Sequence, residues 1–129
     1  MTKKDLEQFL SIRTEIKQLN EQKEFLEEQK TSIKSQIITD LPRGGQVKLL
    51  EDIIIQIEEI IIKIAQKSAD LARQMITIEN SIEELDSVER RLVRYKYFDG
   101  MTYSKIECKM NYSISHLKRM HSDILKKIA

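Results

Sequence analysis

A short stretch near the C-terminus gathers the side chains best suited to binding a charged, hydrogen-bonding partner. Hydroxyls, an imidazole and two cations recur there at helical spacing: Ser113, Ser115, His116, Lys118, Arg119 and Ser122. Thr102 stands before the preceding apolar segment, where its hydroxyl and nearby backbone N–H groups can meet a phosphate. Lysine and arginine donate to guanine acceptors and to phosphates, and serine and histidine donate or accept. These seven residues form the candidate binding site.

The sequence offers little for catalysis or for metal binding. No nucleophile lies beside a base in a recognisable motif, and no glycine-rich phosphate loop is present. The two histidines, His116 and His121, are five residues apart, and the single cysteine, Cys108, adds no ligand in register. We therefore expect no metal, no cofactor and no disulfide within the chain, and a binding protein rather than an enzyme.

The first of three predicted C-terminal helices begins at a capping box. Asp86 is placed to cap the helix and Glu89 to reach back to it. Asp99-Gly100 ends the helix, because glycine accepts the left-handed conformation that follows a helix terminus. The apolar face of this helix comprises Val88, Leu92, Tyr95 and Phe98.

Two further helices complete this segment. Thr102 is predicted to cap a short helix over residues 103–110, and Asn111 suits the left-handed turn after it. Ser113 or Ser115 then caps a helix that runs to the C-terminus with a polar, basic exposed face. A short helix, a tight turn and a second helix of this kind form a helix-turn-helix.

Charge separates this segment from the rest of the chain. The net charge of +1 conceals 12 Lys+Arg against 16 Asp+Glu in residues 1–85 and 10 against 5 in residues 86–129. A basic segment of this size suits the phosphates of a nucleic acid. A solvated basic face on a three-helix bundle that binds protein explains the same charges.

Residues 1–85 are predicted to form a long antiparallel helical hairpin. Apolar residues alternate at spacings of three and four along two segments, as in coiled coils. The first seam comprises Phe9, Ile12, Ile16, Leu19, Lys23, Leu26, Lys30, Ile33 and Ile37. The second comprises Val47, Leu50, Ile54, Ile57, Ile61, Ile64, Ser68, Leu71, Met75, Ile78, Ile82 and Leu85. Pro42, Gly44 and Gly45 predict a turn over residues 39–45.

The expected fold is therefore all-α. A coiled-coil hairpin over residues 1–85 serves oligomerisation, and a small three-helix helix-turn-helix domain follows over residues 86–129. The charged N-terminus and the short apolar runs predict neither a signal segment nor a membrane span. We accordingly expect a cytoplasmic protein.

The second hairpin helix carries more apolar surface than one partner helix covers. Ile53, Ile55, Ile60 and Ile62 lie off the predicted seam. Because a large exposed apolar surface usually marks an interface, we expect self-association, most simply as a two-fold dimer. The alternative is that the C-terminal helices fold back over residues 53–62.

The C-terminal third resembles region 4 of bacterial sigma factors. The resemblance rests on Leu85-Asp-Ser-Val-Glu-Arg-Arg-Leu-Val, Tyr95-Lys-Tyr-Phe-Asp-Gly-Met-Thr-Tyr-Ser-Lys-Ile106 and Asn111-Tyr-Ser-Ile-Ser-His-Leu-Lys-Arg-Met. With the long hairpin before it, nearly the whole chain resembles the RinA/ArpU-type regulators of phages and prophages of Gram-positive bacteria. This resemblance implies an activator that binds double-stranded DNA in a bacterial host, with RNA polymerase as a further partner.

The resemblance also implies which side chains read the DNA. By position, base reading falls to Ile114, Ser115, Lys118 and Arg119. Ile114 stands where sigma factors often carry a basic residue, and Glu107 stands where helix-turn-helix units usually need a small one. Because burying an unpaired carboxylate is costly, we expect Glu107 to pair with a lysine or arginine, or the two helices to sit slightly apart.

Two other functions fit the same sequence. A phage DNA-packaging subunit, similar to a small terminase, also combines a helix-turn-helix with an oligomerising helical region, usually in rings of many subunits. A coiled-coil protein whose tail binds another protein is the third possibility. The leading hypothesis is a sequence-specific DNA-binding transcriptional regulator.

Overall fold

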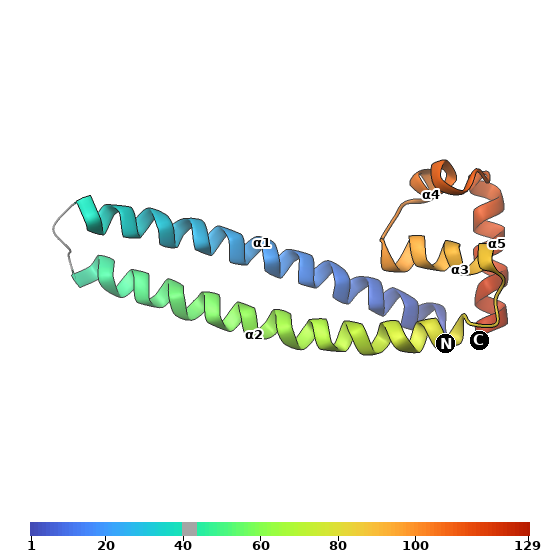
Figure 1. The fold of residues 1–129 in the computed structure, drawn as a ribbon, viewed down its shortest axis with the longest axis horizontal. Helices are drawn as coiled ribbons and strands as arrows, with labels where there is room; N and C mark the ends of the chain where they lie inside the picture. Colours follow the sequence, from blue (N-terminus) through green and yellow to red (C-terminus); the bar gives the residue numbers. More distant parts are fainter. Residues whose placement is uncertain (40–43) are drawn as a thin grey trace. The chain divides into compact units, whose positions relative to one another are not determined.

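In the computed structural model, which describes residues 1–39 and 44–129, every regular element is helical. The elements are α1 (Lys3–Thr39), α2 (Gly44–Ser81), α3 (Ser87–Val93), the π-helical turn η1 (Arg94–Phe98), α4 (Tyr103–Met110) and α5 (Ile114–Ile128) (Figure 1). The all-α prediction is confirmed. The predicted turn at Pro42 lies outside the described residues. No described helix combines the length and the apolar character that crossing a membrane would require.

Helices α1 and α2 form the predicted hairpin and run side by side (Figure 1). Every residue of the predicted α1 seam is buried or half-buried, so the prediction for this helix is confirmed. The seam includes Lys23 and Lys30, whose aliphatic stems cover apolar surface while their ammonium groups reach water.

Four of the twelve residues of the second predicted seam are wrong, because Val47, Ile61, Ser68 and Met75 are exposed. The other eight, Leu50, Ile54, Ile57, Ile64, Leu71, Ile78, Ile82 and Leu85, are buried or half-buried as expected. Ile53, Ile60, Lys67 and Gln74, which the prediction left out, are also buried or half-buried. Ile53 is 7% exposed, whereas Ile61 is 46% exposed.

The positions of α2 that lie in the seam differ from the prediction for a physical reason. Isoleucine occupies both 53 and 54 and both 60 and 61, so two neighbouring seams are apolar and the periodicity alone does not choose between them. Further along, Lys67 lies in the true seam because its ammonium group pairs with Glu15 of α1 at 2.8 Å. A polar residue therefore occupies a position that the apolar pattern would have assigned to the surface.

The chain divides into two compact units. One is Thr14–Asp70, the middle of the hairpin, with a small core of Ile33, Ile53 and Ile57. The other joins Met1–Arg13 to Leu71–Ala129 and so contains both hairpin ends together with the three C-terminal helices.

A single core joins those hairpin ends to the C-terminal helices. It comprises Leu6, Phe9, Ile78, Ile82, Leu85, Leu92, Val93, Tyr97, Ile106, Met110, Leu117 and Ile124. The ring centroids of Phe9 and Phe98 are 5.1 Å apart. Arg94 forms a two-point ion pair with Glu79 of α2, with both N···O distances 2.8 Å. The C-terminal segment therefore shares its core with the two ends of the hairpin.

The predicted capping box at the start of α3 is present. The N–H of Glu89 donates to Asp86 Oδ1 at 2.8 Å, and the N–H of Asp86 donates to Glu89 Oε1 at 3.4 Å. Gly100, with φ of 64°, supplies the predicted left-handed residue after the helix. Capping of this kind typically stabilises a helix by about 1 kcal/mol.

The π-helical turn changes which side chains of residues 94–98 reach the core. The N–H of Asp99 donates to the carbonyl oxygen of Arg94 at 3.0 Å, so the turn holds one residue more than an α-helical turn. Tyr97 is consequently fully buried, while the predicted core residues Tyr95 and Phe98 are only half-buried.

Tyr97 and His121 form a buried polar pair inside this core. Tyr97 Oη lies 2.6 Å from His121 Nε2, and the imidazole is 7% exposed. Burial lowers the pKa of His121 to about 4; the charges of Lys96 and Lys3 act in the same direction, and Glu7 opposes them. Burial also raises the pKa of the Tyr97 phenol. Both groups are therefore neutral near pH 7.

This pair predicts that the protein loses stability in mild acid. The unfolded chain protonates His121 near pH 6.5 and the folded chain only near 4, so its contribution is complete above pH 6.5 and falls as the pH drops toward 4. Between pH 7.5 and pH 5.0 we expect the free energy of unfolding in urea to fall by about 2 kcal/mol.

Two variants identify the titrating group. His121→Phe should flatten the pH dependence, whereas His116→Gln should keep it, because His116 is exposed. An unchanged pH dependence in the His121→Phe protein would assign the effect to other groups.

Candidate nucleic-acid interface

Helices α4 and α5 and the turn between them have the predicted geometry. Thr102 Oγ1 accepts the N–H of Lys105 at 3.4 Å and begins α4. Asn111 has φ of 61°, the left-handed conformation that the turn requires. Ser113, the first of the two predicted caps, accepts the N–H of His116 at 3.2 Å and begins α5.

All seven predicted site residues are exposed. Ser115, Arg119 and Ser122 follow one another at spacings of four and three residues, so they share one face of α5. Lys118 lies next to that face and its ammonium group reaches Tyr103 of α4. His116 is held against Tyr112, with ring centroids 5.0 Å apart.

The hydroxyls of Thr102 and Ser113 already accept hydrogen bonds from the backbone. Both oxygens accept N–H groups of their own helices. A hydroxyl can still donate its hydrogen to a phosphate oxygen while it accepts such a bond. These two residues therefore suit contacts that position a backbone and do not read bases.

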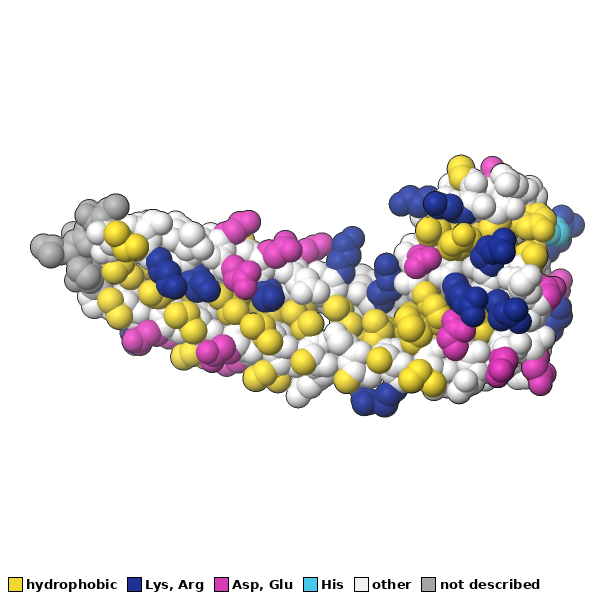
Figure 2. All heavy atoms as spheres, viewed as in Figure 1, with side chains coloured by type: hydrophobic (Ala, Val, Ile, Leu, Met, Phe, Trp, Pro, Cys, Tyr) yellow, Lys and Arg dark blue, Asp and Glu magenta, His cyan; other side chains and the backbone are white. Residues whose placement is uncertain are grey.

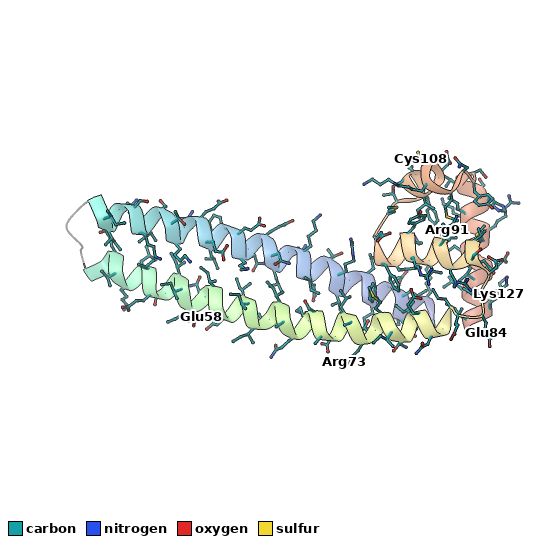
Figure 3. All side chains as sticks on the ribbon, viewed as in Figure 1. Glu58, Arg73, Glu84, Arg91, Cys108 and Lys127 are labelled. Carbon is teal, nitrogen blue, oxygen red and sulfur yellow. The ribbon has the colours of Figure 1, made fainter. Side chains whose placement is uncertain are left out.

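Three cations of the C-terminal segment have carbonyl or carboxylate partners within the fold. Arg90 donates to the carbonyl oxygens of Glu83 and Leu85, at the turn that follows α2. Arg94 pairs with Glu79. Lys127, labelled on α5 in Figure 3, pairs with the buried carboxylate of Glu89 at 2.8 Å. These cations account for part of the basic charge of the segment without a ligand.

The cations of the candidate site are not neutralised in this way. Arg119 forms no ion pair with any residue in the described part of the chain. Lys118 contacts only the face of an aromatic ring among the described residues, which leaves its positive charge in place. Within the candidate site, the charge that α5 presents to a partner therefore comes from these two residues, and Lys126 is also exposed on α5.

Glu107 is not buried, and its hydrogen-bond partner is a backbone N–H and not the expected lysine or arginine. The side chain is exposed, and its Oε2 accepts the N–H of Ile114, the first residue of α5, at 3.1 Å. The first N–H groups of a helix lack partners within the helix and carry partial positive charge, so a carboxylate is favourable there. Glu107 consequently ties α4 to the start of α5.

Lys96 and Tyr103 are not among the residues that the sequence predicts to bind a partner. In the structure Lys96 Nζ lies 4.2 Å from the centroid of the Tyr103 ring, and Lys118 Nζ lies 5.7 Å from the same centroid. The direction of Lys96 depends on the π-helical turn, and no residue pattern in the sequence indicates that turn. These two residues extend the candidate site from α5 to the start of α4.

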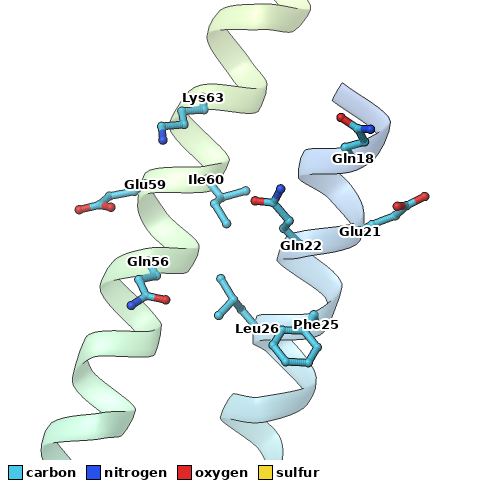
Figure 4. Close-up of a pocket in the computed structure, with 9 residues that line it drawn as sticks. All are labelled: Gln18, Glu21, Gln22, Phe25, Leu26, Gln56, Glu59, Ile60 and Lys63. Atoms are coloured by element: carbon cyan, nitrogen blue, oxygen red, sulfur yellow. The ribbon is translucent and has the colours of Figure 1, made fainter. Parts of the chain in front are cut away.

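Other parts of the molecule offer little for chemistry. No group of three or more His, Cys, Asp or Glu side chains within residues 1–39 and 44–129 could hold a metal ion. A groove between α1 and α2 is lined by Phe25, Leu26 and Ile60 among polar side chains (Figure 4). Glu21 and Glu59 also line it, but their carboxylates point away from each other, so they form no acid–base pair.

No protein-family model, no curated protein and no solved structure matches this chain.

The hydrogen bond between Glu107 and the N–H of Ile114 is expected to contribute measurably to the free energy of unfolding. Glu107→Ala should lower the free energy of unfolding in urea by about 1 kcal/mol, because the N–H of Ile114 loses a charged acceptor. Glu107→Gln should retain most of it, since the amide oxygen still accepts. Glu24→Ala, at an exposed position of α1, is the matched control; an equal loss in the Glu24→Ala and Glu107→Ala proteins would contradict a capping role.

Proposed function

We propose that the chain is a sequence-specific double-stranded DNA-binding transcriptional regulator, an activator of phage or prophage genes of the RinA/ArpU type. The observation that carries this proposal is the α4–turn–α5 unit, in which Asn111 makes the tight turn and α5 presents exposed donors, acceptors and cations. A unit of this form places its second helix in the major groove.

The chemistry of α5 suits reading of base edges. Arg119 can donate two hydrogen bonds to guanine, and Ser115 and Ser122 on the same face can donate or accept. Ile114, half-buried and with its N–H bound to Glu107, contributes at most an apolar contact such as that with a thymine methyl group. Base discrimination therefore centres on Ser115, Arg119 and Ser122, with Lys118 beside them.

Self-association is the second part of the proposal. Ile55 and Ile62 of α2 are 52% and 57% exposed, although the hairpin covers Ile53. Figure 2 shows hydrophobic side chains at the surface of the hairpin. Surfaces of this kind usually mark an interface, and we propose that a second copy of the chain covers this one. A two-fold dimer supplies two copies of α5 and suits a DNA site with two half-sites.

The remaining partners follow from the resemblance alone. Region 4 of sigma factors contacts RNA polymerase, so the polymerase is a candidate second partner in the cytoplasm of a bacterial host.

The DNA-binding proposal predicts that Lys118→Ala with Arg119→Ala abolishes site-specific binding. Each good bidentate base contact contributes about 1–3 kcal/mol, so with a lost phosphate contact the affinity should fall at least 100-fold. The measurement is a titration of DNA selected from a random library. Lys17→Ala with Lys63→Ala, which removes the same charge from exposed hairpin positions, is the control. Normal binding by the Lys118/Arg119 variant, with unchanged helical content, would refute the proposal.

The self-association proposal predicts a mass change when charge enters the apolar surface. Ile55→Glu with Ile62→Glu should convert a dimer to a monomer, because burying unpaired carboxylates is costly. Gln56→Glu, at an exposed position of the same helix, should remain dimeric. The mass is measured by sedimentation equilibrium. A monomeric wild-type chain contradicts self-association, and a ring of eight or more subunits favours the DNA-packaging function instead.

A further inference from the structure

The ring of Tyr103, the first residue of α4, lies close to the ammonium groups of two lysines that are distant in sequence. Lys96 comes from η1 and Lys118 from α5, with their Nζ atoms 4.2 and 5.7 Å from the ring centroid. The ring keeps both ammonium groups within about the 10 Å over which 0.1 M salt screens charge. The lysine pair therefore acts as one concentrated positive charge beside the first turn of α4.

The first turn of α1 adds to this charge. Lys3 and Lys118 both lower the pKa of Lys96, after the larger effect of burial, and Glu7 is the carboxylate that opposes them. Glu7 Oε1 lies 3.9 Å from Lys3 Nζ, so the same carboxylate also acts on Lys3. Lys3 and Lys118 thus both repel Lys96, and repulsion among cations makes binding of an anion favourable.

Resting on the DNA-binding function proposed above, we propose that Lys96 and Lys118, arranged around Tyr103, bind one phosphate of the DNA backbone. Tyr103 is the first residue of α4, and the first N–H groups of a helix favour the same ligand. A phosphate held there would position the backbone for base reading by the neighbouring face of α5.

The position of the cluster favours a phosphate of bound DNA as its ligand. Its cations are lysines, which bind phosphate as point charges. The cluster is also continuous with the candidate base-reading face, because Lys118 lies three residues after Ser115 and four before Ser122 on α5.

The test is the salt dependence of binding to a short DNA duplex by the full chain. Each phosphate contact contributes about 0.9 to the slope of log affinity against log salt. Lys96→Gln should lower the slope by about that amount and weaken binding to all sequences alike. Lys96→Arg, which keeps the charge, should restore the slope. Lys17→Gln, an equal charge change at an exposed position of α1, should leave it unchanged.

The outcomes separate this inference from the function on which it rests. If the wild-type chain binds DNA and Lys96→Gln leaves the slope unchanged, the phosphate cluster is overturned and the DNA-binding function stands. If the wild-type chain binds no DNA, both are overturned. Thermal unfolding in inorganic phosphate against chloride at equal ionic strength identifies the source: stabilisation that Lys96→Gln abolishes, without DNA binding, would assign the cluster to free phosphate and overturn the backbone contact.

Discussion

The C-terminal helices depend on a core that they do not complete themselves. Residues 86–129 are near the lower limit of length at which a chain forms a core without disulfides, metals or association. Leu6 and Phe9 of α1, Ile78 of α2 and Ile82, which follows α2, supply further apolar surface, and each fully buried side chain of this size contributes about 1.5–3 kcal/mol. The placement of α5 is therefore a property of the whole unit Met1–Arg13 with Leu71–Ala129.

The same packing engages some cations of this segment and leaves others exposed. Arg90 has carbonyl partners, Arg94 of η1 pairs with Glu79 of α2, and Lys127 of α5 pairs with Glu89 of α3. Lys118 and Arg119 have no carboxylate partner among the described residues and remain exposed on α5. The net charge of the segment therefore overstates what a ligand meets, and the ion-pair geometry gives the better measure.

The features that depend on neighbouring residues could be predicted from the sequence. The seam of α1, the caps at Asp86, Thr102 and Ser113, and the turn at Asn111 each follow from a few neighbouring residues. The features that could not be predicted are those for which two alternative packings are similarly apolar, or which depend on a contact between residues that are not neighbours in sequence. Two apolar seams compete in α2, the π-helical turn has no residue signature, and the partner of Glu107 lies across a turn. The buried His121 was missed because it is polar within an otherwise apolar face.

The discontinuous unit makes one core depend on both ends of the chain. The first thirteen residues share that core with a segment that is synthesised much later, and residues 14–70 lie between the two in sequence. Closing so long a loop carries an entropy cost that grows with its length, and structure within the loop shortens the part that must still close. The stability of the surface that α5 presents is therefore coupled to the residues furthest from it in sequence.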